Sequence, residues 1–139
     1  TYSDGNPCHV QESLSLAIWM LHAVPDVLRP DGTPTVLKIG VSSGPFTTGI
    51  IGLQSPRYSV FGDTVNTASR MASNSTPSTD ANPFIHIAPS SIALLTAAED
   101  ESWMSKAAPG MEITARDDAI EVKGKGCMQT YCLWKPSRV

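Results

Sequence analysis

The chain has 139 residues, enough for one domain, or part of one, with a buried core. Apolar residues make up 41% and charged residues 17%, which is ordinary for a soluble globular protein. The net charge of −3 argues against general nucleic-acid binding, which needs a basic face, and no apolar run approaches the roughly 20 residues that span a bilayer.

The three cysteines, Cys8, Cys127 and Cys132, form no CxxC pair and leave one thiol unpaired under any disulfide scheme. A reducing compartment is the simpler interpretation, so we expect a cytoplasmic location. That expectation is compatible with a membrane anchor elsewhere in a longer protein. The chain does not begin with Met and opens on a loop-like segment, so we expect it to belong to something larger.

The first predicted element is a long amphipathic helix from residue 8 to about residue 28. Trp19 and Met20 lie near its apolar stripe, and we predict from their residue types that both join the core. Pro25 predicts the approach of the helix end. The stripe itself is formed, at helical spacing, by Leu14, Ala17, Ile18, Leu21 and Val24.

Three β-type runs follow, and the third leads into a helix that Gly62 or Asp63 can cap and that runs through about Ser73. Residues 74–83 are small, polar and proline-containing, which predicts a loop. A further helix covers residues 89 to about 98. The predicted strands are residues 36–41, 48–51, 58–61, 84–87, 111–115, 120–122 and 129–134, the last two flanking a turn at 123–126. This interleaving predicts an α/β sandwich with a mostly antiparallel sheet.

The most informative stretch is residues 57–71, RYSVFGDTVNTASRM, which predicts a strand, a glycine break and a helix. On this helix Asn66 and Arg70 are four residues apart and share one polar side. An amide and a guanidinium in this arrangement can hold a sugar oxygen and a phosphate together, because the planar guanidinium donates two parallel charge-assisted hydrogen bonds. Taken alone, such a pair is more often a solvated helix face.

This stretch resembles the signature of class III adenylyl and guanylyl cyclases, in which a strand, Gly-Asp-Thr-Val-Asn and an Ala-Ser-Arg-Met helix follow in this order. The resemblance extends to residues 37–44 (LKIGVSSG), 48–52 (TGIIG) and 121–126 (EVKGKG), and guanylyl cyclases are the most similar members. It implies the ferredoxin-like cyclase fold, an α/β sandwich. On this comparison residues 1–139 form the C-terminal portion of a catalytic domain, without the N-terminal, metal-binding part.

The resemblance also implies roles for individual residues. Asn66 matches the asparagine that orients the ribose, and Arg70 matches the arginine that stabilises the α-phosphate in the transition state. Lys123 and Lys125 lie at the turn whose lysine contacts the triphosphate. Lys38 matches a triphosphate-binding position that is usually arginine, and lysine offers a point charge without the guanidinium fork.

The activity implied is that of a phosphorus–oxygen lyase that converts a purine nucleoside triphosphate into a 3′,5′-cyclic nucleotide and pyrophosphate. The residues around Ser59 favour GTP and cGMP formation by a guanylate cyclase. Ser59 matches the base-selecting position, and its hydroxyl can donate to a guanine carbonyl or accept from an adenine amino group. Adenylate cyclase activity on ATP therefore stays open as the alternative.

The family binds two ions, Mg²⁺ or Mn²⁺, through two aspartates that precede the first helix. Nothing in residues 1–7 supplies them, since Asp4 is a lone acid in a loop and Asp63 is better interpreted as a helix-start residue. We therefore expect no metal ligands in this chain and no activity from the isolated fragment. The histidines show no metal-ligand spacing either.

The expected partners are GTP or ATP and a second cyclase domain, paired head to tail in a homodimer or heterodimer, and no nucleic acid. A rival interpretation is a cyclase-like dimerisation or regulatory module without catalysis. Asn66, Arg70 and the two turn lysines argue against it, because an inactive copy has no reason to keep them. An unrelated phosphate-binding domain is disfavoured, since the chain carries no P-loop and no GxGxxG fingerprint.

Overall fold

A computed structural model of the protein describes residues 8–78, 82–98, 102–122 and 126–136. No helix within these ranges combines the length and the apolar character that a membrane crossing requires. The elements in chain order are α1 (Cys8–Ala23), the 3-10 turn η1 (Val24–Asp26), β1 (Ile39–Val41), β2 (Thr47–Ile51), β3 (Arg57–Phe61), α2 (Asp63–Ser73), β4 (Phe84–Ile87), α3 (Pro89–Ala97), α4 (Ser102–Ala107), β5 (Glu112–Ala115), β6 (Ile120–Val122), β7 (Gly126–Met128) and β8 (Tyr131–Trp134).

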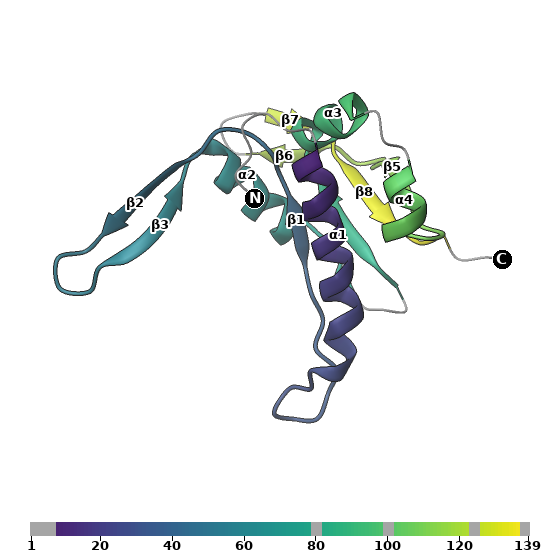
Figure 1. Cartoon of the computed structure of the whole chain (residues 1–139), viewed down its shortest axis with the longest axis horizontal. Helices are drawn as coiled ribbons and strands as arrows, with labels where there is room; N and C mark the ends of the chain where they lie inside the picture. The colour runs from purple at the N-terminus through teal and green to yellow at the C-terminus, as the bar shows by residue number, and fades with distance from the viewer. Residues whose placement is uncertain (1–7, 79–81, 99–101, 123–125, 137–139) are drawn as a thin grey trace.

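Four strands form the central sheet, in the order β1-β4-β8-β5. β1 and β4 are parallel, whereas β8 runs antiparallel to both β4 and β5. The prediction of helices packed on a mostly antiparallel sheet is therefore confirmed. The strands β2–β3 and β6–β7 form two separate hairpins, and the first of these projects away from the rest of the molecule (Figure 1).

The main core lies between one face of this sheet and the helices α1, α3 and α4. Successive side chains of a strand point to opposite faces, so Ile85, Ile87 and Leu133 share the face that α1 covers, and all three are fully buried. The predicted stripe of α1 is confirmed as its core side. All five stripe residues are buried: Leu14, Ala17, Ile18 and Leu21 in α1, and Val24 in η1.

The outward side of α1 contradicts the prediction made for two large apolar residues. Trp19 is 66% exposed and Met20 is 41% exposed, although both were expected in the core. The phase of the helix decides this: each residue is rotated by about 100° from the one before it, and the stripe around Ile18 points these two side chains away from the sheet. The helix also ends at Ala23, earlier than expected, because the turn η1 begins there around Pro25.

The C-terminal strands differ from the prediction in their pairing. β6 pairs with β7, which was not predicted, so that Ile120 lies opposite Met128. β8 instead joins the central sheet between β4 and β5. Residues 120–122 and 129–134 therefore do not form one hairpin. The helix α4 was also missed, since its six residues carry too short an apolar pattern to be recognised.

α2 covers the opposite face of the sheet, and β1 runs directly beneath it. Met71 of α2 is fully buried and packs with Ile120 and Val122 of β6. Gly40 of β1 lies so near the helix that a Cβ atom there would collide with the backbone nitrogen of Ala72. The absence of a side chain at this position therefore sets how deeply α2 sits on the sheet.

A buried histidine joins α2 to the sheet. His86 of β4 is fully buried, its Nδ1 lies 2.9 Å from the Met71 carbonyl oxygen, and its Nε2 lies 2.8 Å from Thr130 Oγ1. A carbonyl oxygen only accepts, so Nδ1 carries the proton, and the bare Nε2 of the neutral ring accepts from the Thr130 hydroxyl. Burial lowers the pKa of His86, the Met71 hydrogen bond opposes this, and the charge of Arg116 lowers the pKa further.

We predict that Gly40→Ala lowers the free energy of unfolding by about 1–3 kcal/mol, as overpacking typically does. The new methyl group would meet the backbone of Ala68 and Ala72, which cannot swing aside as a side chain can. Gly49→Ala is the matched control, since a Cβ there meets Phe61 Cε2 at an ordinary 3.9 Å. Urea unfolding measures both variants, and equal losses of stability would contradict the prediction.

We also predict that the free energy of unfolding falls as the pH drops below the ordinary histidine pKa of about 6.5. In this range His86 binds more protons in the unfolded chain than in the folded chain, where its pKa is lowered, so protons favour the unfolded state. Urea unfolding between pH 8 and pH 5 measures the slope. His86→Gln should remove much of this slope, and an unchanged slope in His86→Gln would contradict the prediction.

Candidate functional site

α2 begins at a glycine that the chain geometry requires. Gly62, in the N-cap position, has a φ of 132°, a conformation that side chains disfavour, and its carbonyl accepts from Asn66 N at 3.1 Å. Asp63 is the first helical residue, where an acid interacts well with the helix dipole. Thr64 Oγ1 donates to the Pro45 carbonyl at 2.7 Å and ties this end of the helix to the loop after β1.

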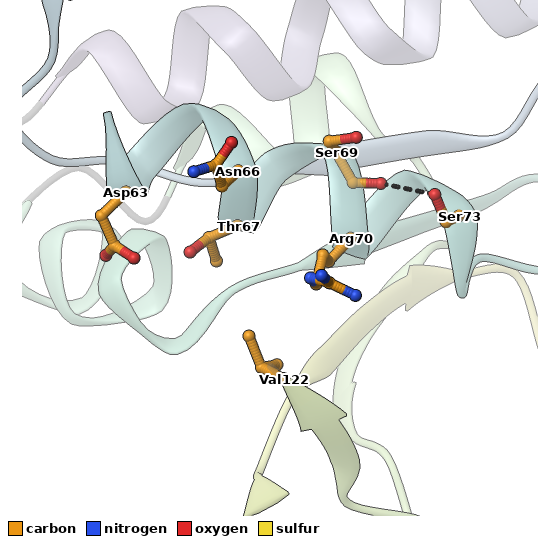
Figure 2. Close-up of a pocket in the computed structure, with 7 residues that line it drawn as sticks. All are labelled: Asp63, Asn66, Thr67, Ser69, Arg70, Ser73 and Val122. Atoms are coloured by element: carbon orange, nitrogen blue, oxygen red, sulfur yellow. Dashed lines mark hydrogen bonds between the residues drawn. The ribbon is translucent and has the colours of Figure 1, made fainter. Parts of the chain in front are cut away.

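The polar side of α2 lines an open groove of about 650 Å³. The structure brings Asn66 and Arg70 together there, on successive turns. Figure 2 shows Arg70 extending from the helix toward Val122, at the end of β6. The residues that line the groove are Asp63, Asn66, Thr67, Ser69, Arg70, Ser73 and Val122. An amide, a guanidinium and several hydroxyl groups therefore face one space, which suits a ligand with sugar and phosphate oxygens.

Sequence reasoning missed the smaller members of this groove. Ser69 and Ser73 line it together with Thr67, and Ser73 Oγ donates to the Ser69 carbonyl at 2.8 Å (Figure 2). The signal that could have found the two serines is the helical period. Both lie three residues after Asn66 or Arg70, on the same side of the helix.

Lys38 lies at the C-terminal end of α2, beside Ser73, and is not itself among the residues that line the groove. Its Nζ donates to the Ser73 carbonyl at 3.3 Å, and the side chain is exposed. A cation at this position interacts favourably with the negative end of the helix dipole. The same ammonium group therefore brings positive charge close to the residues that line the groove.

The other predicted site residues are not brought to the groove by the described part of the chain. Ser59 lies on β3, opposite Gly49 of β2, in the hairpin that projects from the body (Figure 1). It is not among the residues that line the groove. Lys123 and Lys125 lie outside the described residues. Val122, the residue before Lys123, is part of the groove wall.

The residues of the groove do not fit a metal centre. Among the groove-lining residues that the structure describes, Asp63 is the only carboxylate. The described ranges also contain no group of three or more His, Cys, Asp or Glu side chains that could hold an ion. One carboxylate at a helix N-terminus does not provide the oxygen ligands that two magnesium ions need.

Comparison with known proteins agrees with this geometry. Residues 2–135 match the family described as the adenylate and guanylate cyclase catalytic domain. The guanylate cyclase soluble subunit beta-2 of Rattus norvegicus is 38% identical over 126 residues, which cover 90% of this chain. The chain spans 16% of the length of that relative.

Two solved structures share the fold. The guanylate cyclase domain of RhGC from Catenaria anguillulae, in complex with GTP, superimposes with a TM-score of 0.69 at 30% identity, covering 93% of this chain and 61% of its own. The catalytic core of a rhodopsin-guanylyl cyclase with converted specificity, in complex with ATPαS, gives a TM-score of 0.68 at 31% identity and covers 90% of this chain and 58% of its own. The match over residues 2–135 shows that the chain belongs to the adenylate and guanylate cyclase catalytic domain family.

Proposed function

We propose that this chain forms part of a purine nucleotide cyclase that converts GTP into 3′,5′-cyclic GMP and pyrophosphate. The observation that carries the proposal is the pairing of Asn66 with Arg70 on one face of α2, in a groove of about 650 Å³. Membership of the cyclase family gives this pair a matching chemistry. Formation of cyclic GMP by a domain that contains this chain, assayed with Mg²⁺ or Mn²⁺, tests the proposal.

In the proposed reaction the ribose 3′-hydroxyl releases its proton to solvent and its oxygen forms a bond to the α-phosphorus. The bond from that phosphorus to the pyrophosphate oxygen breaks, and pyrophosphate leaves. Asn66 holds a ribose oxygen through its amide, which orients the attacking hydroxyl. Arg70 donates two parallel hydrogen bonds to α-phosphate oxygens. These bonds stabilise the negative charge that develops in the transition state. Because both side chains come from one rigid helix, the sugar and the phosphate are held in register.

The triphosphate is proposed to lie toward the C-terminal end of α2. Lys38 is exposed there and can exchange its hydrogen bond to the Ser73 carbonyl for a phosphate oxygen. Lys123 directly follows Val122, which is part of the groove wall, and Lys125 comes two residues later in the sequence. Three lysines with Arg70 would supply the local positive charge that a triphosphate needs in a chain with a net charge of −3.

We propose that a second cyclase domain completes the site, paired head to tail. The β2–β3 hairpin supports this proposal, because it presents Ile50, Leu53 and Tyr58 to solvent with exposed fractions of 75%, 103% and 70%. Exposed apolar patches of this kind mark protein interfaces.

The ligands for Mg²⁺ or Mn²⁺ are proposed to lie outside this chain, so the 139-residue fragment alone should form no cyclic nucleotide. We also propose that the protein domain containing this chain is located in the cytoplasm.

We predict that Arg70→Ala, in a domain extended to include the missing metal ligands, lowers kcat by about 10²–10³ and changes KM much less. The reason is that its contact with the α-phosphate strengthens only in the transition state. Initial-rate kinetics of cyclic nucleotide formation measure both constants. Arg29→Ala is the matched control, since Arg29 is exposed in the turn after η1. A rise in KM at unchanged kcat would make Arg70 a ground-state binder and contradict the assigned role.

We predict that Ser59→Asp reduces the use of GTP, while Ser59→Cys leaves it nearly unchanged. An aspartate carboxylate would face the guanine carbonyl oxygen as acceptor against acceptor, and such a mismatch costs roughly 1–3 kcal/mol. Side-by-side measurements of kcat/KM for GTP and ATP give the change in preference. If the wild-type domain prefers ATP and Ser59→Asp leaves GTP turnover untouched, the guanylate cyclase assignment fails and adenylate cyclase takes its place.

A further inference from the structure

The C-terminal end of α2 is satisfied by donors from several parts of the chain. Asn74 donates to the Arg70 carbonyl through its backbone nitrogen at 3.0 Å and its side-chain amide at 2.9 Å. The backbone nitrogen of Ser75 would ordinarily reach the Met71 carbonyl, but it donates to the Ala72 carbonyl at 3.1 Å. The Met71 carbonyl instead accepts a hydrogen bond from Nδ1 of His86, on strand β4 of the sheet.

His86 belongs to a closed ring of hydrogen bonds around this helix end. Its Nε2 is bonded to the hydroxyl of Thr130, which is fully buried. The Thr130 carbonyl accepts from Arg116 N at 2.8 Å, and Arg116 Nη1 donates to the Asn74 carbonyl at 3.0 Å. Asn74 closes the ring through its two bonds to the Arg70 carbonyl. The last turn of α2 is therefore tied to β4 and to the segments that flank β5 and β8.

Met71, whose carbonyl His86 holds, is the residue directly after Arg70. A tilt of the last helical turn would be magnified at the end of the long guanidinium side chain, which reaches into the groove (Figure 2). Catalytic groups lose much of their effect when they are displaced by about 1 Å, on the order of 10²-fold in rate. Within the described part of the chain, His86 is hydrogen-bonded to the Met71 carbonyl and to Thr130, neither of which lines the groove.

We propose that His86 is a positioning residue for cyclisation: by holding the Met71 carbonyl it keeps the last turn of α2 where Arg70 meets the α-phosphate. This inference rests on the proposed function. His86 itself does not contact the nucleotide in this proposal, because it lies beneath the helix and not in the groove. The neutral ring with its proton on Nδ1 is the form that donates to the Met71 carbonyl and so holds the helix end.

Two substitutions separate positioning from a general loss of stability. In His86→Asn the side-chain amide nitrogen can occupy the place of Nδ1 and donate to the Met71 carbonyl. In His86→Gln the amide lies one bond further out, near the place of Nε2, and leaves that carbonyl without its donor. Both variants bury a neutral amide in the same space, so they form a matched pair. His22→Gln, at an exposed position on α1, is the control for replacing any histidine.

In the extended domain we expect His86→Gln to lower kcat on the order of 10²-fold at nearly constant KM, and His86→Asn to retain most of the wild-type kcat. His22→Gln should behave as the wild type. Equal losses of kcat in His86→Asn and His86→Gln, in proportion to their losses of stability, would overturn the proposal. A rise in KM at constant kcat in His86→Gln would also overturn it.

Amide hydrogen exchange of the 139-residue chain tests the same ring without a nucleotide. We expect exchange at Asn74 and Ser75 to rise in His86→Gln about tenfold more than exchange at Leu14 in α1, because the opening is local. A uniform rise at all three amides would overturn the positioning role. If the wild-type extended domain forms no cyclic nucleotide, the proposed function fails, and the exchange pattern still decides whether His86 holds the helix end.

Discussion

The site depends on how closely β1 passes beneath α2. At Gly40 there is no room for a Cβ atom against the backbone of Ala68 and Ala72, so the helix lies directly on the strand. Met71, on the side of α2 that faces the sheet, is fully buried, and this fixes the rotation of α2 about its own axis as well. Asn66 and Arg70 then face outward into the groove as a consequence of packing on the opposite side.

The end of α2 from which Arg70 projects also gathers positive charge. Lys38 bonds to the carbonyl of Ser73, and Arg116 bonds to the carbonyl of Asn74, so both cations complement the negative end of the helix dipole. His86 completes the set as a neutral ring, since a charged imidazolium would be costly in this buried position beside Arg116. The same side chains therefore stabilise the helix end and place positive charge beside it.

The sequence predicted the parts of this arrangement that depend on local pattern. The stripe of α1, the strand β3 and the glycine break before α2 follow from spacing and from the conformational freedom of Gly62. Asn66 and Arg70 could be paired because four residues complete about one helical turn. Trp19 was misplaced, because residue type alone does not give the phase of a helix. His86 could not be found, since its role depends on Thr130, which lies 44 positions further along the chain.

The two ends of the proposed nucleotide site are supported in different ways. The phosphate end, at Arg70, stands on a helix that is held at Thr64, at Gly40 and by the ring through His86. Ser59, the proposed base-selecting residue, lies on a hairpin that forms its own two-stranded sheet and projects from the body (Figure 1). A two-stranded hairpin is only marginally stable without further packing. Covering its apolar side chains by a second domain would therefore also set the position of Ser59. In the proposed site, base selection would then be coupled to the pairing of the two domains, whereas the position of Arg70 is set by packing within this chain.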